Sequence, residues 1–364
     1  MKRELTPDDA QSSSWCGSVL ASGGGGWVWH GELMGPLATT VGTPVLATVD
    51  ELDDDDLVAT VTAIGAPGAA DWEIRPLDYV RALELLMDEA PGPIKAVMTG
   101  QNGSSTTLNG WIQSAVLGVL VLDAAGDIRA HPTGKLGSMG LTTRPGYRTV
   151  QAVAGGNRRL NGGAMEVVAK GAPVVTSNVL RDACVRAGGF IAAARHPVEA
   201  SWVKANAAVG AITYALELGA AMRAVEGDAE RVIDAACTTT GGSIVGRGPV
   251  HIPTPVRTEG GFDHGRFEVE RLSLPFLNGY MAVDRDGERR ATYPDVIATL
   301  AGETGRPVAI ADMVEGMNVA VFVVPRQRLI LSSSTRDRPS LEEVEHIMGI
   351  EIVRHVGDIL EPSR

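Results

Sequence analysis

The sequence predicts an α/β protein of two domains, and three observations support this interpretation. In the first half, apolar runs typical of strands alternate with helical patterns, which favours an open, mostly parallel sheet with helices on both faces. The second half instead combines short β-type runs and turn signals with one long stretch of small residues, as in an α+β domain. The length of 364 residues also suits two domains. We place the N-terminal domain at residues 1–160 and the C-terminal domain at residues 161–364.

The elements of the first half follow from local patterns. Pro7 and the two aspartates after it can begin a helix, which the glycine run Gly23–Gly26 ends. Apolar residues between Leu77 and Met87 recur at helical spacing, and Pro91 stops that pattern. We therefore expect helices at residues 1–22, 31–40, 76–90 and 111–117, and strands at residues 44–49, 57–64, 95–99 and 119–122.

The second half is predicted from the same kinds of signal. The stretch Ala200–Ala224 has apolar and small residues at helical spacing, so we expect one long helix there. Strands are expected around it at residues 189–194, 267–269, 272–276, 281–283 and 319–324, and a turn at 284–287. No internal repeat is visible.

Composition and charge argue against several classes of function. The net charge of −12 gives no electrostatic footprint for nucleic acid. The polar N-terminal residues lack the apolar region of a signal peptide, and no apolar run is long enough to span a bilayer. Three widely spaced cysteines without a CxxC pair support neither a zinc ribbon nor a disulfide framework. We expect a cytoplasmic protein that acts on a small molecule, without nucleic-acid or membrane partners.

Three polar or glycine-rich segments follow predicted strands of the first half, where open α/β sheets bind ligands. They are Gly65–Gly68, Gly100–Ser105 and Asp123–His131. The third is the richest, with two carboxylates (Asp123, Asp127), a guanidinium (Arg129) and an imidazole (His131) within nine residues. Such groups suit acid–base chemistry. The alternative is a solvated loop held by an Asp–Arg pair, but the position after a buried strand favours function.

The glycine run at residues 23–26 has two interpretations. Exposed main-chain N–H groups before a helix can bind an anion or a carbonyl oxygen. The run matches neither common phosphate-loop motif, and a tight packing turn explains four glycines equally well.

Seven motifs resemble one known family in their order and spacing, over nearly the whole chain. They are GGGG at 23–26, IGAPG at 64–68, VLDAAGDIRAHPTGKLGSMGL at 121–141, GAMEVVAKG at 163–171, EGGFDHG at 259–265, FLNGYMAV at 276–283 and YPDVIATLAGETGRPV at 293–308. The sequence resembles the DUF917 family, also called the S-methyl thiohydantoin desulfurase family. The resemblance implies a Rossmann-like N-terminal half and a swivelling β/β/α-like C-terminal half.

The resemblance also implies an activity. This is hydrolysis at C2 of an S-methyl thiohydantoin, which breaks a C–S bond and gives a hydantoin and methanethiol. The alternative is a non-catalytic or regulatory subunit that binds a hydantoin and serves a hydantoinase- or oxoprolinase-type enzyme. We also expect a homo-oligomer.

Such a reaction needs an acid, a base and a polar environment for the ring oxygen. We expect Asp123 or Asp127 to be the base, or the acid at the ring nitrogen, and His131 to carry the other proton transfer. Arg129 would hold a substrate carboxylate or orient an aspartate. The alternative is a zinc-activated water, with His131 and acidic residues as ligands.

Residues of three further segments are expected to bind the substrate. Main-chain N–H groups of Gly24, Gly25 and Gly26, and of the turn at Asn102, would face carbonyl oxygens of the ring. Asn278 would contact the substrate from the second domain.

Overall fold

Four neighbouring strands run parallel at the centre of the first sheet in the computed structural model, which describes residues 2–360. In spatial order the sheet contains β1 (Lys2–Glu4), β2 (Val45–Ala47), β5 (Leu120–Ala125), β4 (Ile94–Thr99), β3 (Leu57–Gly65), β8 (Phe190–Glu199), β6 (Thr149–Gly155) and β7 (Met165–Gly171). Strands β2, β5, β4 and β3 are parallel, and the outer strands pair antiparallel. The α/β class is therefore confirmed.

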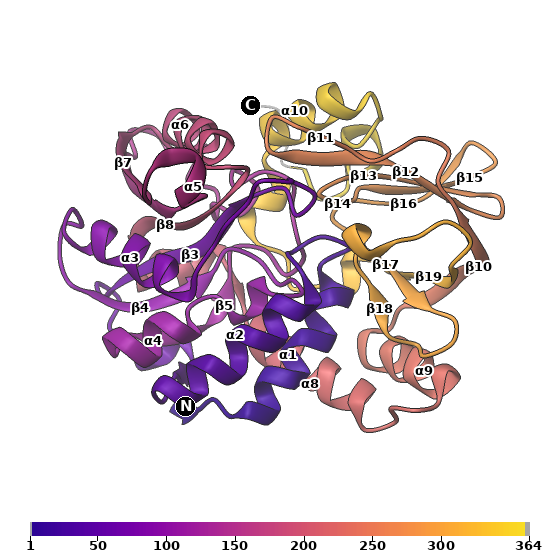
Figure 1. Cartoon of the computed structure of the whole chain (residues 1–364), viewed down its shortest axis with the longest axis horizontal. Helices are drawn as coiled ribbons and strands as arrows, with labels where there is room; N and C mark the ends of the chain where they lie inside the picture. The colour runs from indigo at the N-terminus through magenta and orange to yellow at the C-terminus, as the bar shows by residue number, and fades with distance from the viewer. Residues whose placement is uncertain (1, 361–364) are drawn as a thin grey trace.

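Helices cover both faces of this sheet (Figure 1). On one face pack α2 (Val28–Val41), α3 (Pro76–Met87) and α4 (Trp111–Leu117), and on the other α6 (Pro173–Arg186) and α7 (Ala200–Asn206). Successive side chains of a strand point to opposite faces. Within β3, Val61 therefore packs in the cluster of α3, whereas Ile64 packs in the cluster of α6.

The second sheet is antiparallel. In spatial order it contains β16 (Glu288–Thr292), β15 (Ala282–Arg285), β13 (Leu272–Leu277), β12 (Phe262–Val269), β10 (Ser243–His251), β19 (Asn318–Val324), β17 (Val296–Ala301) and β18 (Pro307–Val308), with β11 (Arg257–Glu259) beside β12 and β14 (Gly279–Tyr280) beside β13. Phe267 and Phe276 share one apolar cluster with Ile297 and Val321, which come from the other half of the sheet. The sheet therefore curls over its own core.

Helix α1 (Pro7–Leu20) lies between the two sheets (Figure 1). It begins at Pro7, the helix start that the sequence suggested, because the Thr6 hydroxyl caps the N–H of Asp9 and the Asp9 carboxylate accepts the N–H of Thr6. Residues 2–4 of the helix predicted at 1–22 instead form β1. Its apolar face packs with α8 (Ala211–Arg223), α9 (Ala229–Thr240) and strands β17 and β19. This helix thereby joins the N-terminal segment to the second sheet.

The predicted long helix at residues 200–224 is wrong as a single element. The chain leaves α7, forms the short strand β9 (Ala208–Val209) against β5, and then enters α8. Gly210 makes the bend with φ of +87°. Pairing with a strand some 80 residues away replaces helical hydrogen bonds there, and no local pattern announces it.

The division between the sheets falls later than residue 160. Strands β7, β8 and β9 all follow that position and pair within the first sheet. The strand expected at residues 189–194 therefore lies in the first sheet, not in the C-terminal part where we expected it. The division of the chain into two independent domains, residues 1–160 and 161–364, stays a prediction.

A long irregular segment joins β5 to β6 and is covered by the C-terminal part of the chain. Leu136 packs with Leu341 of α10 (Arg338–Met348), and Lys135 forms a 2.7 Å ion pair with Glu343. The short α5 (Arg158–Asn161) follows β6. No helix within residues 2–360 is long and apolar enough to cross a membrane.

Candidate functional site

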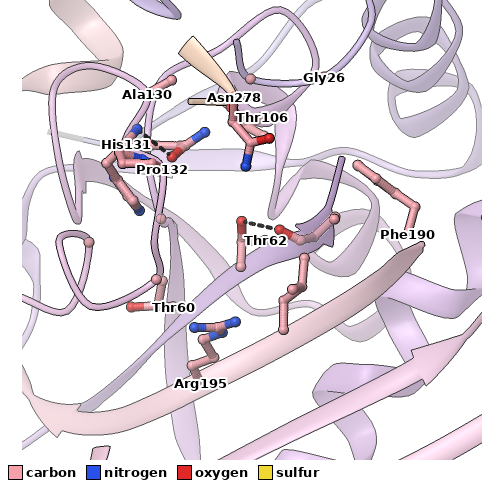
Figure 2. A pocket seen from close by; sticks show the side chains of 18 of the residues that line it. Gly26, Thr60, Thr62, Thr106, Ala130, His131, Pro132, Phe190, Arg195 and Asn278 are labelled. Carbon is pink, nitrogen blue, oxygen red and sulfur yellow. Dashed lines mark hydrogen bonds between the residues drawn. The ribbon is translucent and has the colours of Figure 1, made fainter. Parts of the chain in front are cut away.

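A pocket opens over the face of the first sheet that carries α6, near the carboxyl ends of the parallel strands (Figure 2). The space measures about 750 Å³, part of it open to solvent. Loops that follow β3, β4 and β5 all reach it, contributing Pro67, Gln101 and His131. Asn278 borders it from the second sheet. The three loops expected to converge do so, because parallel strands end on one edge of their sheet.

The pocket is lined by polar atoms that lack partners. Among the residues that line it, those with a buried side-chain nitrogen or oxygen without a hydrogen bond are Thr60, Thr106, His131, Arg195 and His196. Buried polar groups in proteins are normally paired. Their concentration here leaves donors and acceptors free for a polar molecule in the pocket.

His131 is the one predicted catalytic side chain that lines the pocket. Its main-chain N–H donates to Oε1 of Gln101 at 3.0 Å, and its ring lies against Gly137. Burial first, and then the charges of Arg195, Arg129 and Arg181, lower the pKa of its imidazole to about 3. The ring is therefore neutral at pH 7 and can accept a proton.

Asp127 lies behind His131 and does not line the pocket. Its Oδ2 accepts a 2.8 Å hydrogen bond from the Tyr293 hydroxyl and lies 3.9 Å from Nδ1 of His131. That distance is too long for a hydrogen bond. Burial raises the pKa of Asp127 to about 6, so the carboxylate is mostly ionised at pH 7. It can stabilise a positive charge on His131 but cannot itself reach a ligand.

The glycine run is divided between a packing turn and the lining of the pocket. Gly25 and Gly26 line the pocket with φ of +74° and +86°, and their N–H groups have no hydrogen bond within residues 2–360. Gly24 lies outside it, where an added Cβ would approach the carbonyl oxygen of Asn278 to 2.3 Å. Gly24 therefore belongs to a packing turn, whereas Gly25 and Gly26 can donate to a ligand.

Asn278 lines the pocket from the second sheet, and its contact with a substrate stays a prediction. It adopts φ of +57°, which asparagine tolerates better than most residues. Its Oδ1 accepts the N–H of Asp263 at 2.8 Å, which leaves Nδ2 to donate into the pocket. Asp263 also accepts the N–H of Gly68 at 2.7 Å. This hydrogen bond connects the second sheet beside Asn278 to the loop after β3.

Three of the predicted site residues have structural partners and lie outside the pocket lining. Asp123 caps α8, accepting the N–H groups of Ile212 and Thr213. Asn102 is buried, and its Nδ2 donates to the carbonyl oxygens of residues 128 and 211. Arg129 is also fully buried, and it donates to the carbonyl oxygens of residues 280 and 295. The structure thus assigns these three polar groups to holding the fold, against our expectation.

Arg195 and Arg181 are the residues that sequence reasoning missed. Arg195 comes from β8 and Arg181 from α6, and both line the pocket. The available signal was an arginine inside an otherwise apolar strand, FIAAARHPV at residues 190–198. A buried strand retains a charge only where a partner compensates for it.

The zinc alternative does not suit the side chains present. Within residues 2–360, no three histidine, cysteine, aspartate or glutamate side chains lie close enough to hold a metal ion. Around His131 the charged neighbours are arginines and the single carboxylate Asp127. The three arginine charges that act on the imidazole would repel zinc rather than favour its binding.

Fold and site together define an α/β protein with a polar pocket at the carboxyl edge of its first sheet. Residues 12–160 match the family model described as S-Me-THD-like, N-terminal domain, and residues 172–335 match S-Me-THD-like, C-terminal domain. The chain therefore belongs to the S-Me-THD-like family, the S-methyl thiohydantoin desulfurase or DUF917 family, which confirms the resemblance seen in the motifs.

An X-ray crystal structure of a protein from Chromobacterium violaceum has a similar fold. It is 20% identical in sequence and superposes with a TM-score of 0.72, over 95% of this chain and 96% of that chain. At this identity the likeness concerns the fold alone. No curated protein matches the chain.

Proposed function

We propose that this protein hydrolyses an S-methyl thiohydantoin at C2, releasing methanethiol and leaving a hydantoin. The observation that carries the proposal is the neutral, unpaired imidazole of His131 at the wall of a polar pocket. Family membership supports the substrate class, because both halves of the chain match models named for S-methyl thiohydantoin.

The pocket has the groups that such a hydrolysis needs. Water attacks C2 and gives a proton to His131. The positive charge that forms on the imidazole is stabilised by the Asp127 carboxylate, whose Oδ2 lies 3.9 Å from Nδ1 of His131. As water adds, the electron pair of the C2–N double bond moves to the ring nitrogen. The tetrahedral adduct then expels methanethiolate, which takes the proton from His131 and leaves as methanethiol. The second proton of the water passes from the C2 hydroxyl to the ring nitrogen, which gives the hydantoin. The C2–S bond is broken, the C2–O bond is formed, and one water is consumed.

Ring binding is assigned to other polar groups that line the pocket. The N–H groups of Gly25 and Gly26 and the Nδ2 of Asn278 face the carbonyl oxygen of the ring. The buried hydroxyls of Thr60 and Thr106 have no partner within residues 2–360 and can pair with ring nitrogens. These donors hold the ring, whereas His131 acts on the water.

The test is release of methanethiol from S-methyl thiohydantoins, followed with a thiol-reactive dye. His131→Ala should lower kcat by about two to four decades, the usual size of general-base catalysis. His251→Ala is the matched control, because that histidine, at the end of β10, is exposed and pairs with Glu315. Its rate should equal that of the unaltered protein.

The same experiment decides between enzyme and binding subunit. Tight binding of hydantoin by the unaltered protein, with no thiol released from any S-methyl thiohydantoin, would overturn the enzymatic proposal. The non-catalytic alternative, a hydantoin-binding partner of a hydantoinase-type enzyme, would then stand.

A further inference from the structure

Strand β7 leaves one edge of the first sheet without a partner. It is the last strand in the order of that sheet, and within residues 2–360 its main chain has hydrogen bonds to β6 alone. It has seven residues, whereas the other strands at the ends of the two sheets, β1, β16 and β18, have three, five and two. Figure 1 shows β7 at the margin of the molecule, on the side away from the second sheet.

The backbone of β7 is suited to pairing with a further strand. Proteins usually block a free edge with a proline, a bulge or a very short strand. β7 contains no proline, and its pairing with β6 runs from Met165 to Gly171 without a bulge. Alternate residues of an edge strand direct their N–H and C=O groups outward. β7 therefore offers a row of unpaired main-chain groups.

The side chains of β7 alternate between two environments. Those of odd number from Met165 to Ala169 are half-buried and pack in the apolar cluster of α6. Those of even number, Glu166, Val168 and Lys170, are exposed on the opposite face. The exposed face thus presents an acid, an apolar residue and a base in a row.

This row is self-complementary about Val168. Consider two β7 strands that pair antiparallel, with a two-fold axis at Val168. Glu166 then lies opposite Lys170 of the partner subunit, and the two valine side chains cover each other. Unlike charges directly opposite in an antiparallel pair are favourable, and like charges are unfavourable. A register centred on Glu166 or on Lys170 would oppose like charges, so the two side chains select the register centred on Val168.

Apolar side chains beside the strand would also be covered. In the same register Val167 lies opposite Ala169 of the partner subunit, on the half-buried face. Helix α6 follows β7 directly, and Val174 and Val175 in its first turn are 38% and 62% exposed. Contiguous exposed apolar surface of this kind marks contact sites in proteins.

We propose that two copies of this chain associate through β7, which joins their first sheets into one continuous sheet across a two-fold axis at Val168. The same surface serves both copies, as a two-fold interface requires. The inference is independent of the proposed reaction, because none of residues 165–171 lines the pocket.

Charge reversal tests the interface and its register together. Sedimentation velocity would give the dissociation constant of the dimer. Glu166→Lys places lysine opposite lysine at both ends of the paired segment, and Lys170→Glu places glutamate opposite glutamate. Each variant should raise the dissociation constant at least about tenfold.

Mixing the two variants provides the decisive measurement. Every cross-strand charge pair between a Glu166→Lys chain and a Lys170→Glu chain unites a lysine with a glutamate. The mixture should therefore form a heterodimer, with a dissociation constant within about threefold of that of the unaltered dimer. Within each chain Arg81 and Glu89 pair with Glu166 and Lys170, and mixing repairs neither of those ion pairs. Recovery would thus report contacts between chains alone.

Glu230→Lys is the matched control. Glu230 is an exposed glutamate that accepts two hydrogen bonds from Arg247, as Glu166 does from Arg81. It lies on α9, in the layer that packs with the second sheet. Its reversal should leave the dissociation constant unchanged.

Hydrogen exchange locates the interface independently. Main-chain amides of residues 165–171 should exchange more slowly as the concentration of the unaltered protein rises, because the second copy takes up their outward N–H groups. Residues 288–292 of β16, at the edge of the second sheet, should exchange at the same rate throughout.

The outcomes decide the matter apart from catalysis. A monomer at every concentration measured would overturn the proposal. So would a dimer that neither reversal weakens, or a mixture of the two variants that stays monomeric. Loss of the dimer in both variants and its return on mixing would establish the interface, whether or not thiol is released.

Discussion

Tyr293 and Asp127 join the two halves of the chain at the candidate site. Tyr293 follows β16 in the chain, and Asp127 follows β5. The Tyr293 hydroxyl donates a 2.8 Å hydrogen bond to Oδ2 of Asp127. The same oxygen faces Nδ1 of His131 at 3.9 Å. The second sheet therefore holds the carboxylate that lies behind the proposed base, and the position of that carboxylate depends on how the two sheets are packed.

The burial of Asp127 predicts a pH-dependent effect on stability. Its pKa is raised from 3.8 to about 6, so the folded protein binds this proton more tightly than the unfolded chain does. The contribution to stability is then present below pH 4 and is lost as pH rises through 6, at a cost on the order of 3 kcal/mol. Asp127→Asn should therefore unfold at higher urea than the unaltered protein at pH 7, and at similar urea at pH 4. Its kcat should fall at least about tenfold. An equal difference in stability at both pH values would contradict this account.

Substitution of Gly137 by alanine should lower activity while the protein stays folded. An added Cβ would lie 2.2 Å from Cε1 of His131, so Gly137→Ala must displace the imidazole. We expect kcat to fall by about tenfold to a hundredfold, since small misplacements of a catalytic group are costly. Gly163→Ala is the control, because nothing lies within 4 Å of that position. Unchanged kcat in Gly137→Ala would show that His131 is not the base.

Arg129 should matter for stability rather than for substrate binding. Arg129→Met leaves the carbonyl oxygens of residues 280 and 295 without their buried donor, at a cost on the order of 3 kcal/mol. Urea unfolding would measure this, with the exposed Arg290→Met as control, expected within about 0.5 kcal/mol of the unaltered protein. A raised KM at full stability would restore the substrate-anchoring role that the sequence suggested.

Asp123 should behave as a helix cap. Asp123→Ala removes the acceptor for the N–H groups of Ile212 and Thr213, so we expect a loss of about 1–2 kcal/mol in the free energy of unfolding. The folded variant should keep kcat within about threefold, which a catalytic carboxylate would not allow. Asp228→Ala is a matched comparison, since Asp228 caps α9 through the single N–H of Arg231.

Local sequence patterns were enough to predict the start of the first helix and the central strands of the first sheet. Helix α1 starts at Pro7 because its capping residues are sequence neighbours, and β3, β4 and β5 are apolar runs that end in polar or glycine-rich loops. Parallel strands end on one edge, so convergence of those loops followed from the order of the elements. The place of His131 at the pocket could be predicted in the same way, because it lies a few residues after the end of β5.

Tertiary structure decided which charged side chain meets the pocket. Arg129 and Asp123 lie in the same rich segment as His131, yet distant main-chain groups of residues 212, 280 and 295 occupy them. Arg195 looks in the sequence like a misfit in an apolar strand, and it faces the pocket because β8 inserts between β3 and β6. The pairing of β9 with β5 likewise broke a helix that spacing alone predicted. In each case the partner lies far along the chain, so its hydrogen bonds and charge become visible only once the strands are paired.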